Sequence, residues 1–326
     1  MQKGKEILYL SLADVKAVGL TMKETMEAVE KAFIEKGHGR FQMPPKPGLH
    51  PRGDAFIHAM PAYLPEMKAA GLKWVSGFPE NVQYGLPYIT GLLVLNCPDT
   101  GVPLAVMDCV WITAQRTGAV SGVTAKCLAR QDSAIAAIIG CGVQARTQLE
   151  ALAVALELKT VKCYDINQEQ VELYIGDMQS KLPGLEFVTV KNAKEAVTDS
   201  DVVVTAGPIL KHPNPEIELS WLKDGVLGLP IDFDSYWKPE AMQGVDKFYT
   251  DDEAQFEYYR TVGYFQGAPK ANADMGQLTT GRVPGRANDQ EKIIGMNLGI
   301  AINDMATASR IYQKAMEKGI GATLPL

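Results

Sequence analysis

The first third of the chain carries two hydrophobic periodicities. Apolar residues recur at three- and four-residue steps over residues 11–36, which predicts one amphipathic helix, and Thr21 with Glu24 has the spacing of a capping box inside it. After a Pro-rich turn at residues 43–48, the apolar runs become short and extended, as in strands. We therefore predict a helix packed on a largely antiparallel sheet, with strands at 55–60, 69–75, 91–96 and 103–108 and a hairpin turn at 97–101.

The pattern changes near residue 113. An Ala-rich helix is expected over residues 113–130, and after it strands that are apolar throughout alternate with helices. Such strands are typical of a parallel sheet covered on both faces. A last amphipathic helix, residues 300–318, is expected to pack back on the first part. The fold class is therefore α/β, with parallel strands expected at 134–139, 161–164, 186–190, 202–205 and 225–231.

Composition narrows the class of protein. The 326 residues carry a formal net charge of -6, which disfavours nucleic acid as a partner because phosphate binding needs a basic face. No apolar run reaches the roughly 18 to 20 residues of a membrane helix, so no membrane partner is expected. The five cysteines stand singly, and the four histidines have no metal-ligand spacing. We expect a cytoplasmic protein with reduced thiols and no metal site.

A glycine-rich turn is the strongest local motif. Gly140, Gly142 and Ala145 form G-x-G-x-x-A directly after a predicted buried strand, at the start of a predicted helix. The first glycine suits a tight turn, the second lets the backbone approach a pyrophosphate, and the alanine allows close packing of helix on strand. Val143 and Gln144 supply backbone N–H groups at the helix start. This turn predicts a dinucleotide site.

An acidic residue in the next strand indicates which dinucleotide binds. Asp165 directly follows the strand at 161–164 and lies 165 − 145 = 20 residues beyond Ala145. At this position an acidic residue accepts hydrogen bonds from the ribose hydroxyls of NAD. Ile166 and Asn167 follow, so a 2′-phosphate would meet no arginine there. The alternative is that Asp165 only caps a strand end or a helix. We favour NAD as the cofactor.

Several segments together resemble the ornithine cyclodeaminase/mu-crystallin family, which includes archaeal-type alanine dehydrogenases and ketimine reductases. The resemblance implies a discontinuous α+β substrate-binding and dimerisation domain, residues 1–115 and 304–326, with a Rossmann NAD-binding domain, residues 116–303, inserted in it. It also implies a homodimer. The segments that carry it are residues 59–63, 73–81, 116–119, 140–145, 281–286 and 299–304.

The resemblance implies roles for individual residues. Lys73 matches the active-site lysine, Arg116 the arginine that holds the substrate carboxylate, and Thr117 a cofactor contact. Asp234 matches the aspartate that follows the fifth Rossmann strand, although the sequence around it departs from the usual family pattern and Asp232 is an alternative. The cofactor set is completed by Thr205 and Asn297.

Two departures from the family pattern concern the substrate. Lys46 stands where the family usually has an arginine in the Pro-rich turn, and a point charge recognises a carboxylate less specifically than a planar fork does. His58 stands where ornithine cyclodeaminases carry a glutamate for the distal amine, and histidine has no permanent negative charge at neutral pH. Ornithine is therefore disfavoured as the substrate.

These residues suit hydride transfer at the α-carbon of a small L-amino acid or its imine. Arg116 would fix the carboxylate, Lys73 would hold its other oxygen or move a proton, and Asp234 would serve as the base. The expected function is an NAD-dependent amino-acid dehydrogenase or imine reductase acting on a small amino acid or cyclic imine. The alternatives are a cyclodeaminase that recycles NAD and releases ammonia, and a non-catalytic binding protein of the crystallin type.

Overall fold

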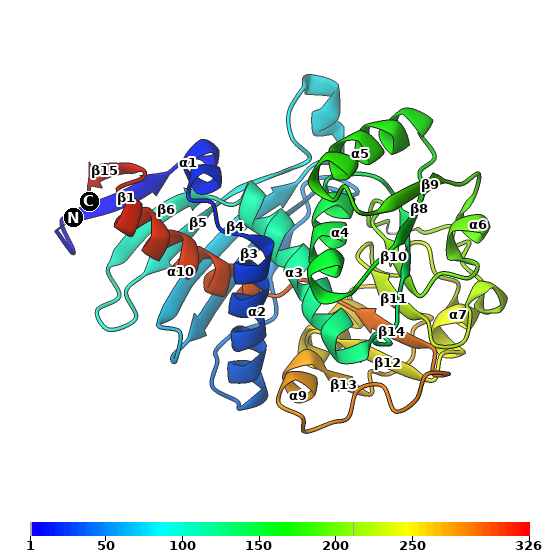
Figure 1. Ribbon diagram of the computed structural model, residues 1–326. Helices are drawn as coiled ribbons and strands as arrows, with labels where there is room; N and C mark the ends of the chain where they lie inside the picture. The colour runs from blue at the N-terminus through cyan, green and yellow to red at the C-terminus, as the bar shows by residue number, and fades with distance from the viewer. Residues whose placement is uncertain (1, 211) are drawn as a thin grey trace. The chain divides into compact units, whose positions relative to one another are not determined.

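The computed structural model describes residues 2–210 and 212–326, and the chain divides into two compact units (Figure 1). Unit 1 comprises Met1–Arg116 and Gly299–Leu326, and unit 2 comprises Thr117–Leu298. The sequence places the second domain boundary after residue 303, whereas Gly299–Asn303 group with unit 1. The reason is local, since Gly299 binds Lys46 and lies against Arg116, both in unit 1.

Unit 1 is built on a seven-stranded sheet in the order β15-β1-β6-β5-β4-β3-β2. Neighbouring strands are antiparallel except β1 and β6, which run parallel. The predicted hairpin turn joins β5 to β6, with the Gly101 N–H donating to the Cys97 carbonyl at 2.8 Å. The strands are β1 (Glu6–Leu10), β2 (Gly48–Leu49), β3 (Phe56–Leu64), β4 (Ala69–Gly77), β5 (Ile89–Asn96), β6 (Pro103–Asp108) and β15 (Ala322–Pro325), and a 3-10 helix, η1 (Pro79–Tyr84), joins β4 to β5.

The single helix predicted over residues 11–36 is wrong, because the chain forms two helices there. α1 (Leu12–Ala17) ends before Gly19, whose φ of +67° is a left-handed conformation that glycine adopts without strain. α2 (Met22–Gly37) begins afresh with Thr21 and Glu24 as a complete capping box. The capping pair therefore marked a helix start, not a position inside a helix.

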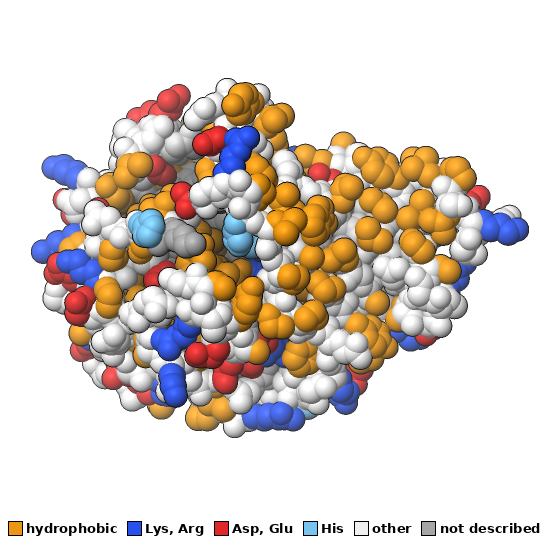
Figure 2. All heavy atoms as spheres, turned by 180° about the vertical axis from the view of Figure 1, so that it is seen from behind, with side chains coloured by type: hydrophobic (Ala, Val, Ile, Leu, Met, Phe, Trp, Pro, Cys, Tyr) orange, Lys and Arg blue, Asp and Glu red, His pale blue; other side chains and the backbone are white. Residues whose placement is uncertain are grey.

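The two faces of the unit 1 sheet differ sharply. Strand registers place Lys73, Leu93 and Met107 on one face, which is buried and packed against α10 (Ala301–Lys318), and α2 packs on α10 in turn. The opposite face carries Trp74 and Leu92, whose side chains are 45% and 46% exposed. Figure 2 shows hydrophobic side chains gathered across this side of the molecule.

Unit 2 contains an eight-stranded sheet in the order β13-β12-β14-β11-β10-β7-β8-β9, and every pair of neighbours is parallel. Strand order reverses between β7 and β10, as in dinucleotide-binding sheets. The predicted parallel α/β fold is confirmed. The strands are β7 (Ile135–Ile139), β8 (Thr160–Tyr164), β9 (Glu186–Thr189), β10 (Val202–Thr205), β11 (Leu227–Pro230), β12 (Lys247–Thr250), β13 (Ala273–Asp274) and β14 (Ile293–Met296).

Helices join these parallel strands. Chain order alternates strand and helix from β7 to β10, which is why the apolar runs of the sequence stand apart. No helix within residues 2–210 and 212–326 combines the length and apolar character needed to cross a membrane. The helices are α3 (Val110–Leu128), which leads into unit 2, α4 (Val143–Ala155), α5 (Gln168–Lys181), α6 (Ala193–Val197), α7 (Pro239–Gln243), α8 (Glu253–Thr261) and α9 (Met275–Thr279), with a 3-10 turn, η2 (Leu219–Trp221).

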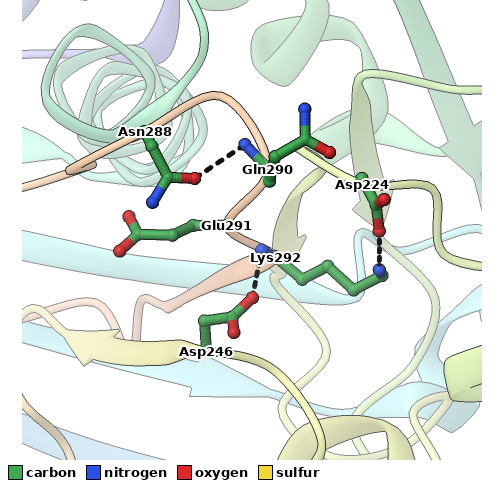
Figure 3. A pocket seen from close by; sticks show the side chains of 6 residues that line it. All are labelled: Asp224, Asp246, Asn288, Gln290, Glu291 and Lys292. Atoms are coloured by element: carbon green, nitrogen blue, oxygen red, sulfur yellow. Dashed lines mark hydrogen bonds and ion pairs between the residues drawn. The ribbon is translucent and has the colours of Figure 1, made fainter.

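A polar hollow lies where β11, β12 and β14 begin (Figure 3). Lys292 pairs there with Asp224, and the Lys292 backbone N–H donates to Asp246 at 2.8 Å. Ligands of parallel α/β sheets bind beyond the carboxyl ends of the strands, and this hollow is at the amino ends. This position excludes it from the candidate site.

Candidate active site

Lys73 occupies the buried face of the unit 1 sheet. It lies on β4 opposite Met60 of β3 and Leu93 of β5, and its side chain is completely buried. The Lys73 Nζ donates a hydrogen bond of 2.7 Å to Oδ1 of Asp304, in the first turn of α10. It also lies 3.4 Å from the Thr113 hydroxyl. An ammonium group is thus held on an inward sheet face by a carboxylate that is itself fully buried.

Arg116 shares that carboxylate oxygen. Its Nε lies 2.9 Å from Asp304 Oδ1, an ion pair outside hydrogen-bond geometry. The Nε and Nη1 of Arg116 and the Oδ2 of Asp304 are buried, and none forms a hydrogen bond with a described residue. Unpaired buried polar groups are costly, so the guanidinium has donors to offer a ligand.

The absence of a side chain at Gly299 leaves room for the Arg116 guanidinium. The φ of Gly299 is +76°, and a Cβ added there would overlap Arg116 Nη1 and lie 3.0 Å from Nη2. The Gly299 carbonyl accepts a hydrogen bond of 3.1 Å from Nζ of Lys46, which is also buried. The backbone just before α10 therefore gathers two cations, and Asp304 holds the third.

His58 borders this cluster on the same sheet face, since it precedes Met60 by two positions on β3. Its ring stacks on Phe56 at 4.3 Å and meets His50 edge-on at 6.0 Å. Burial, and after it the charges of Lys46 and Lys73, lowers the pKa of His58 to about 3. The imidazole is therefore neutral across the physiological range.

The charges within the cluster oppose one another. Burial, followed by the neighbouring Arg116 charge, lowers the pKa of Lys73, and the Asp304 carboxylate works in the other direction. Burial raises the pKa of the nearby Cys109 thiol to about 11. The thiol is thus protonated at neutral pH, and the cluster carries more buried positive than negative charge.

In unit 2 the glycine-rich turn has the predicted geometry at its first glycine. Gly140 has a φ of +88°, and a Cβ there would lie 2.8–2.9 Å from the backbone of Ala206 and Gly207, so no larger residue fits. Gly142 is the N-cap of α4, makes no side-chain cap, and has open space where a Cβ would stand. The first N–H groups of α4, including those of Val143 and Gln144, are thus placed as an anion site requires.

Asp165 stands at the carboxyl end of β8, beside that turn. Its Oδ2 accepts the Cys141 N–H at 2.8 Å, and its Oδ1 accepts the Asn167 N–H at 2.9 Å. Arg146 adds a second tie to the turn, because its Nη1 donates to the carbonyls of Cys141 and Gly142 at 2.9 Å each. Hydrogen bonds therefore fix the glycine-rich turn to Arg146 on one side and to Asp165 on the other.

The two candidate aspartates of unit 2 have different surroundings. Asp232 is fully buried, with Oδ1 accepting from the Thr205 hydroxyl at 2.6 Å and Oδ2 from the Gly207 N–H at 2.9 Å. Burial raises its pKa to about 7. Asp234 is half-buried, accepts the Phe265 N–H at 2.9 Å, and also has a pKa raised by burial.

The remaining predicted cofactor residues are spread over unit 2. Thr205 ends β10 and accepts a hydrogen bond of 3.1 Å from Trp237 Nε1 in addition to its bond with Asp232. Asn297 follows β14 and donates to the Thr124 hydroxyl at 3.1 Å. Thr117 is half-buried in α3. The Thr205 and Asn297 side chains are thus engaged by the protein itself.

Sequence reasoning assigned no role to two residues that organise the unit 1 cluster. Asp304 and Gly299 both lie in the segment 299–304, but as parts of a family motif without a stated function. The one signal in the sequence was an acidic residue among the apolar positions that open the helix at 301–318. In the structure, Lys46, His58, Lys73 and Arg116 lie close together in unit 1.

Comparison with known proteins places the chain in a family. Residues 6–319 match the ornithine cyclodeaminase/mu-crystallin family. The chain is 38% identical to the nodulation efficiency protein NfeD of Rhizobium meliloti over 317 residues, 97% of each chain. The pyrroline-2-carboxylate reductase of Thermococcus litoralis, solved with NADH and L-proline, has a TM-score of 0.88 and 34% identity, covering 97% of this chain and 99% of that one. An archaeal alanine dehydrogenase dimer with bound NAD has a TM-score of 0.87 and 34% identity, covering 98% and 99%. The chain belongs to the ornithine cyclodeaminase/mu-crystallin family.

Proposed function

We propose that this protein is an NAD(H)-dependent enzyme that transfers a hydride at the α-carbon of a small L-amino acid or its imine. One observation carries the proposal. Lys73 and Arg116 are buried on the same carboxylate oxygen of Asp304, and two nitrogens of Arg116 have no hydrogen-bond partner among the described residues. Buried positive charge with unsatisfied donors fits an anionic ligand such as the α-carboxylate.

The substrate carboxylate is assigned to unit 1. Arg116 is engaged by Asp304 through Nε, so its Nη1 edge is the part that can donate to a ligand. Lys46 and Lys73 contribute positive charge beside it. The neutral ring of His58 offers no anion for a distal ammonium group, which supports a small or uncharged side chain on the substrate.

The cofactor is assigned to unit 2, where the residues fit NAD. The pyrophosphate would lie on Gly140, Gly142, Val143 and Gln144 at the start of α4, and Asp165 would accept the ribose hydroxyls. Thr117, Thr205 and Asn297 complete the assignment. NAD, when bound, accepts or returns the hydride. The relatives solved with NADH and with NAD support this choice of cofactor.

Proton transfer is assigned to Lys73 and Asp234. A lysine whose pKa is lowered by burial is suited to exchange a proton near neutral pH, and so is a carboxyl group whose pKa is raised. Asp234 is favoured over Asp232 because its side chain is half-buried, whereas Asp232 is fully buried and accepts a hydrogen bond on each oxygen.

The test is a paired assay of the purified protein that follows NADH absorbance and free ammonia while L-amino acids are screened with NAD. NADH rising together with ammonia is the expected result and identifies a dehydrogenase. Ammonia without net NADH means a cyclodeaminase. A response only to cyclic imines with NADH means a reductase, and silence in all assays would reject the proposal in favour of a binding protein. Asp234→Asn and Asp232→Asn, run in parallel, assign the carboxylate.

We also propose a homodimer formed through the exposed face of the unit 1 sheet. Trp74, Leu92 and Tyr9 share that face by register, with Leu72 and Val94 between them, and a contiguous exposed apolar face of this kind suits an interface. The alanine dehydrogenase relative is a dimer, which supports the proposal. Light scattering should give twice the chain mass, and Trp74→Lys should shift it toward the monomer. A wild-type monomer would reject this surface as an interface.

A further inference from the structure

Asp304 is a carboxylate shared by two buried cations, Lys73 and Arg116. It is fully buried, and a single oxygen, Oδ1, lies 2.7 Å from Lys73 Nζ and 2.9 Å from Arg116 Nε. It stands in the first turn of α10, where the helix dipole stabilises a negative charge. Lys73 comes from β4 and Arg116 from α3. Asp304 therefore fixes two distant elements of unit 1 to one point.

This arrangement orients both partners. Because Asp304 engages Arg116 at Nε, the Nη1 edge is left without a protein partner among the described residues, and the Cα of Gly299 lies beside it. The lysine has only one other hydrogen-bonding neighbour in this structure, the Thr113 hydroxyl at 3.4 Å, among the residues described. Without the carboxylate, neither cation would keep an anionic partner among the described residues.

The protonation of Lys73 depends on the same contact. Burial and the Arg116 charge both favour the neutral amine, and the Asp304 charge and hydrogen bond favour the ammonium form. The groups that face Lys73 come from every element packed around it. They are Asp304 on α10, Arg116 and Thr113 on α3, Cys109 just before α3, and His58 on β3 with Lys46 beside it. Asp304 is the only carboxylate in that set of described residues.

We propose that Asp304 is a positioning residue that holds Lys73 and Arg116 on one oxygen and sets the charge of the Lys73 amine. It acts through these two residues and not by direct contact with the reacting atoms. The inference rests on the proposed function for its effect on turnover. Its effect on the Lys73 amine is independent of any substrate, so the two can be tested apart.

The experiment follows the titration of Lys73 directly. Protein labelled with 13C at the lysine Cε is titrated by NMR as wild type, Asp304→Asn and Asp304→Glu, and Lys73→Met identifies the signal. We expect the Lys73 amine of Asp304→Asn to lose its proton about 1 to 3 pH units lower than in the wild type, and Asp304→Glu to restore much of the difference. An unchanged Lys73 titration in Asp304→Asn would overturn the proposal.

Turnover provides the second readout. The limb of the pH profile that disappears in Lys73→Met should move to lower pH in Asp304→Asn, with kcat lowered about tenfold or more. The matched control is Asp201→Asn, which removes a buried carboxylate of unit 2 that also binds a lysine and an arginine. It should leave both the Lys73 signal and the profile unchanged. A wild type without turnover would reject the proposed function, while the NMR titration would still decide the role of Asp304.

A double variant covers the case in which Asp304→Asn fails to fold. Removing the lysine together with the carboxylate, as Lys73→Met/Asp304→Asn, takes one buried charge of each sign away and leaves Arg116 alone. If Asp304 acts on the chemical step through Lys73, kcat of the double variant equals that of Lys73→Met, and only KM rises. A further loss of kcat, additive with that of Lys73→Met, would refute the proposal.

Discussion

Each unit of this protein contains a buried aspartate joined to one lysine and one arginine, and the two clusters are satisfied to different degrees. In unit 2, Asp201 accepts from Lys223 Nζ at 2.6 Å and from Arg130 Nη2 at 3.3 Å. Its other oxygen accepts two backbone N–H groups at 2.9 Å each, those of Ala134 and Ile135. All the lone pairs that face the protein are in use.

The unit 1 cluster has the same three residue types but a different balance. Asp304 uses one oxygen for both cations, and its second oxygen is buried without a hydrogen-bond partner among the described residues. Lys73 is completely buried, whereas the side chain of Lys223 is 29% exposed. Solvent and backbone N–H groups therefore help to stabilise the charges of the unit 2 cluster. The charges of the unit 1 cluster lack this stabilisation.

The difference separates a structural ion pair from a site. Charges buried for stability are neutralised and hydrogen-bonded by the protein itself, because unsatisfied buried groups are costly. A site that must bind an anion has positive charge and N–H donors that no protein group uses. The Nε and Nη1 of Arg116 are such donors among the described residues. The comparison predicts that equal substitutions in the two clusters have unequal effects on turnover.

Lys73→Met should have the largest effect. Removing the amine should lower kcat/KM by about 100-fold or more, the scale of a lost proton-transfer group, while NADH binding survives because the cofactor is assigned to unit 2. Lys223→Met, the matched change in the other cluster, should alter kcat/KM by less than about twofold. Steady-state kinetics and NADH fluorescence titrations measure both.

Equal losses in the two lysine variants would break the comparison, because the unit 2 cluster would then matter for chemistry as much as the unit 1 cluster. Near-normal turnover in Lys73→Met would remove Lys73 from the site.

Gly299→Ala should rank second. The added Cβ would overlap Arg116 Nη1 and displace the guanidinium, which should raise KM for the substrate by about tenfold, the equivalent of one charge-assisted hydrogen bond. The control is Gly319→Ala, at the C-cap of α10. Gly319 has a φ of +64°, close to the +76° of Gly299, but open space around its Cβ position. Both variants share the backbone strain, and only Gly299→Ala should change KM.

If Gly319→Ala raised KM as much as Gly299→Ala, the effect would be one of backbone strain, and Arg116 would lose its assignment as the carboxylate ligand. Thermal unfolding of both variants measures the strain itself.

How far the sequence could predict the fold depended on local signals. The parallel sheet was predictable because β7 and β10 are buried on both faces and read as continuous apolar runs. The break between α1 and α2 was missed because apolar steps continue across it, so periodicity alone could not detect the turn at Gly19. A capping pair at Thr21 and Glu24 was the signal that should have decided the boundary.

The site was predictable only in part, for a related reason. Lys73 and Arg116 belong to short segments with a recognisable pattern, as does the glycine-rich turn. The hydrogen bond between Lys73 and Asp304 joins residues that are 231 positions apart in the sequence. The residues flanking Lys73 contain no pattern that predicts Asp304 as its partner, and the residues flanking Asp304 contain none that predicts Lys73. A lone aspartate in an amphipathic helix usually faces solvent, so its burial was visible only in the folded chain.

His58→Gln should have a smaller effect, seen in the pH dependence of stability. The folded-state pKa of His58, about 3, lies below the usual histidine value of 6.5, so the unfolded chain binds the proton more readily. The wild type should therefore lose stability as the pH falls from about 6.5 toward 3, and His58→Gln should lose less over that window. Melting temperatures between pH 7.5 and 4.5 measure it, with exposed His38→Gln as the control. Parallel curves for wild type and His58→Gln would mean that burial and the neighbouring positive charges do not lower the pKa of His58 in the folded chain.

Asp201→Asn should have the smallest effect, confined to acid pH. Burial alone would raise the pKa of Asp201, but hydrogen bonds from Lys223 and from the backbone of Ala134 and Ile135 together lower it. Because the folded-state pKa is lowered, the stability it provides is present above the unfolded value of about 3.9 and is lost as the pH falls through the lower folded value. The melting temperature of the wild type should thus fall more steeply below about pH 4 than that of Asp201→Asn.

The matched change near this cluster is Asp132→Asn. Asp132 also pairs with Arg130, at 3.0 Å, but its side chain is 77% exposed, so its contribution is screened by solvent and should hardly alter the acid limb. The opposite outcome is that Asp132→Asn flattens the fall of the melting temperature below pH 4 as much as Asp201→Asn does. Burial and full hydrogen bonding of the carboxylate would then not be the features that separate a structural ion pair from a binding site. The contrast between the two clusters would then have to rest on the unpaired donors of Arg116 alone.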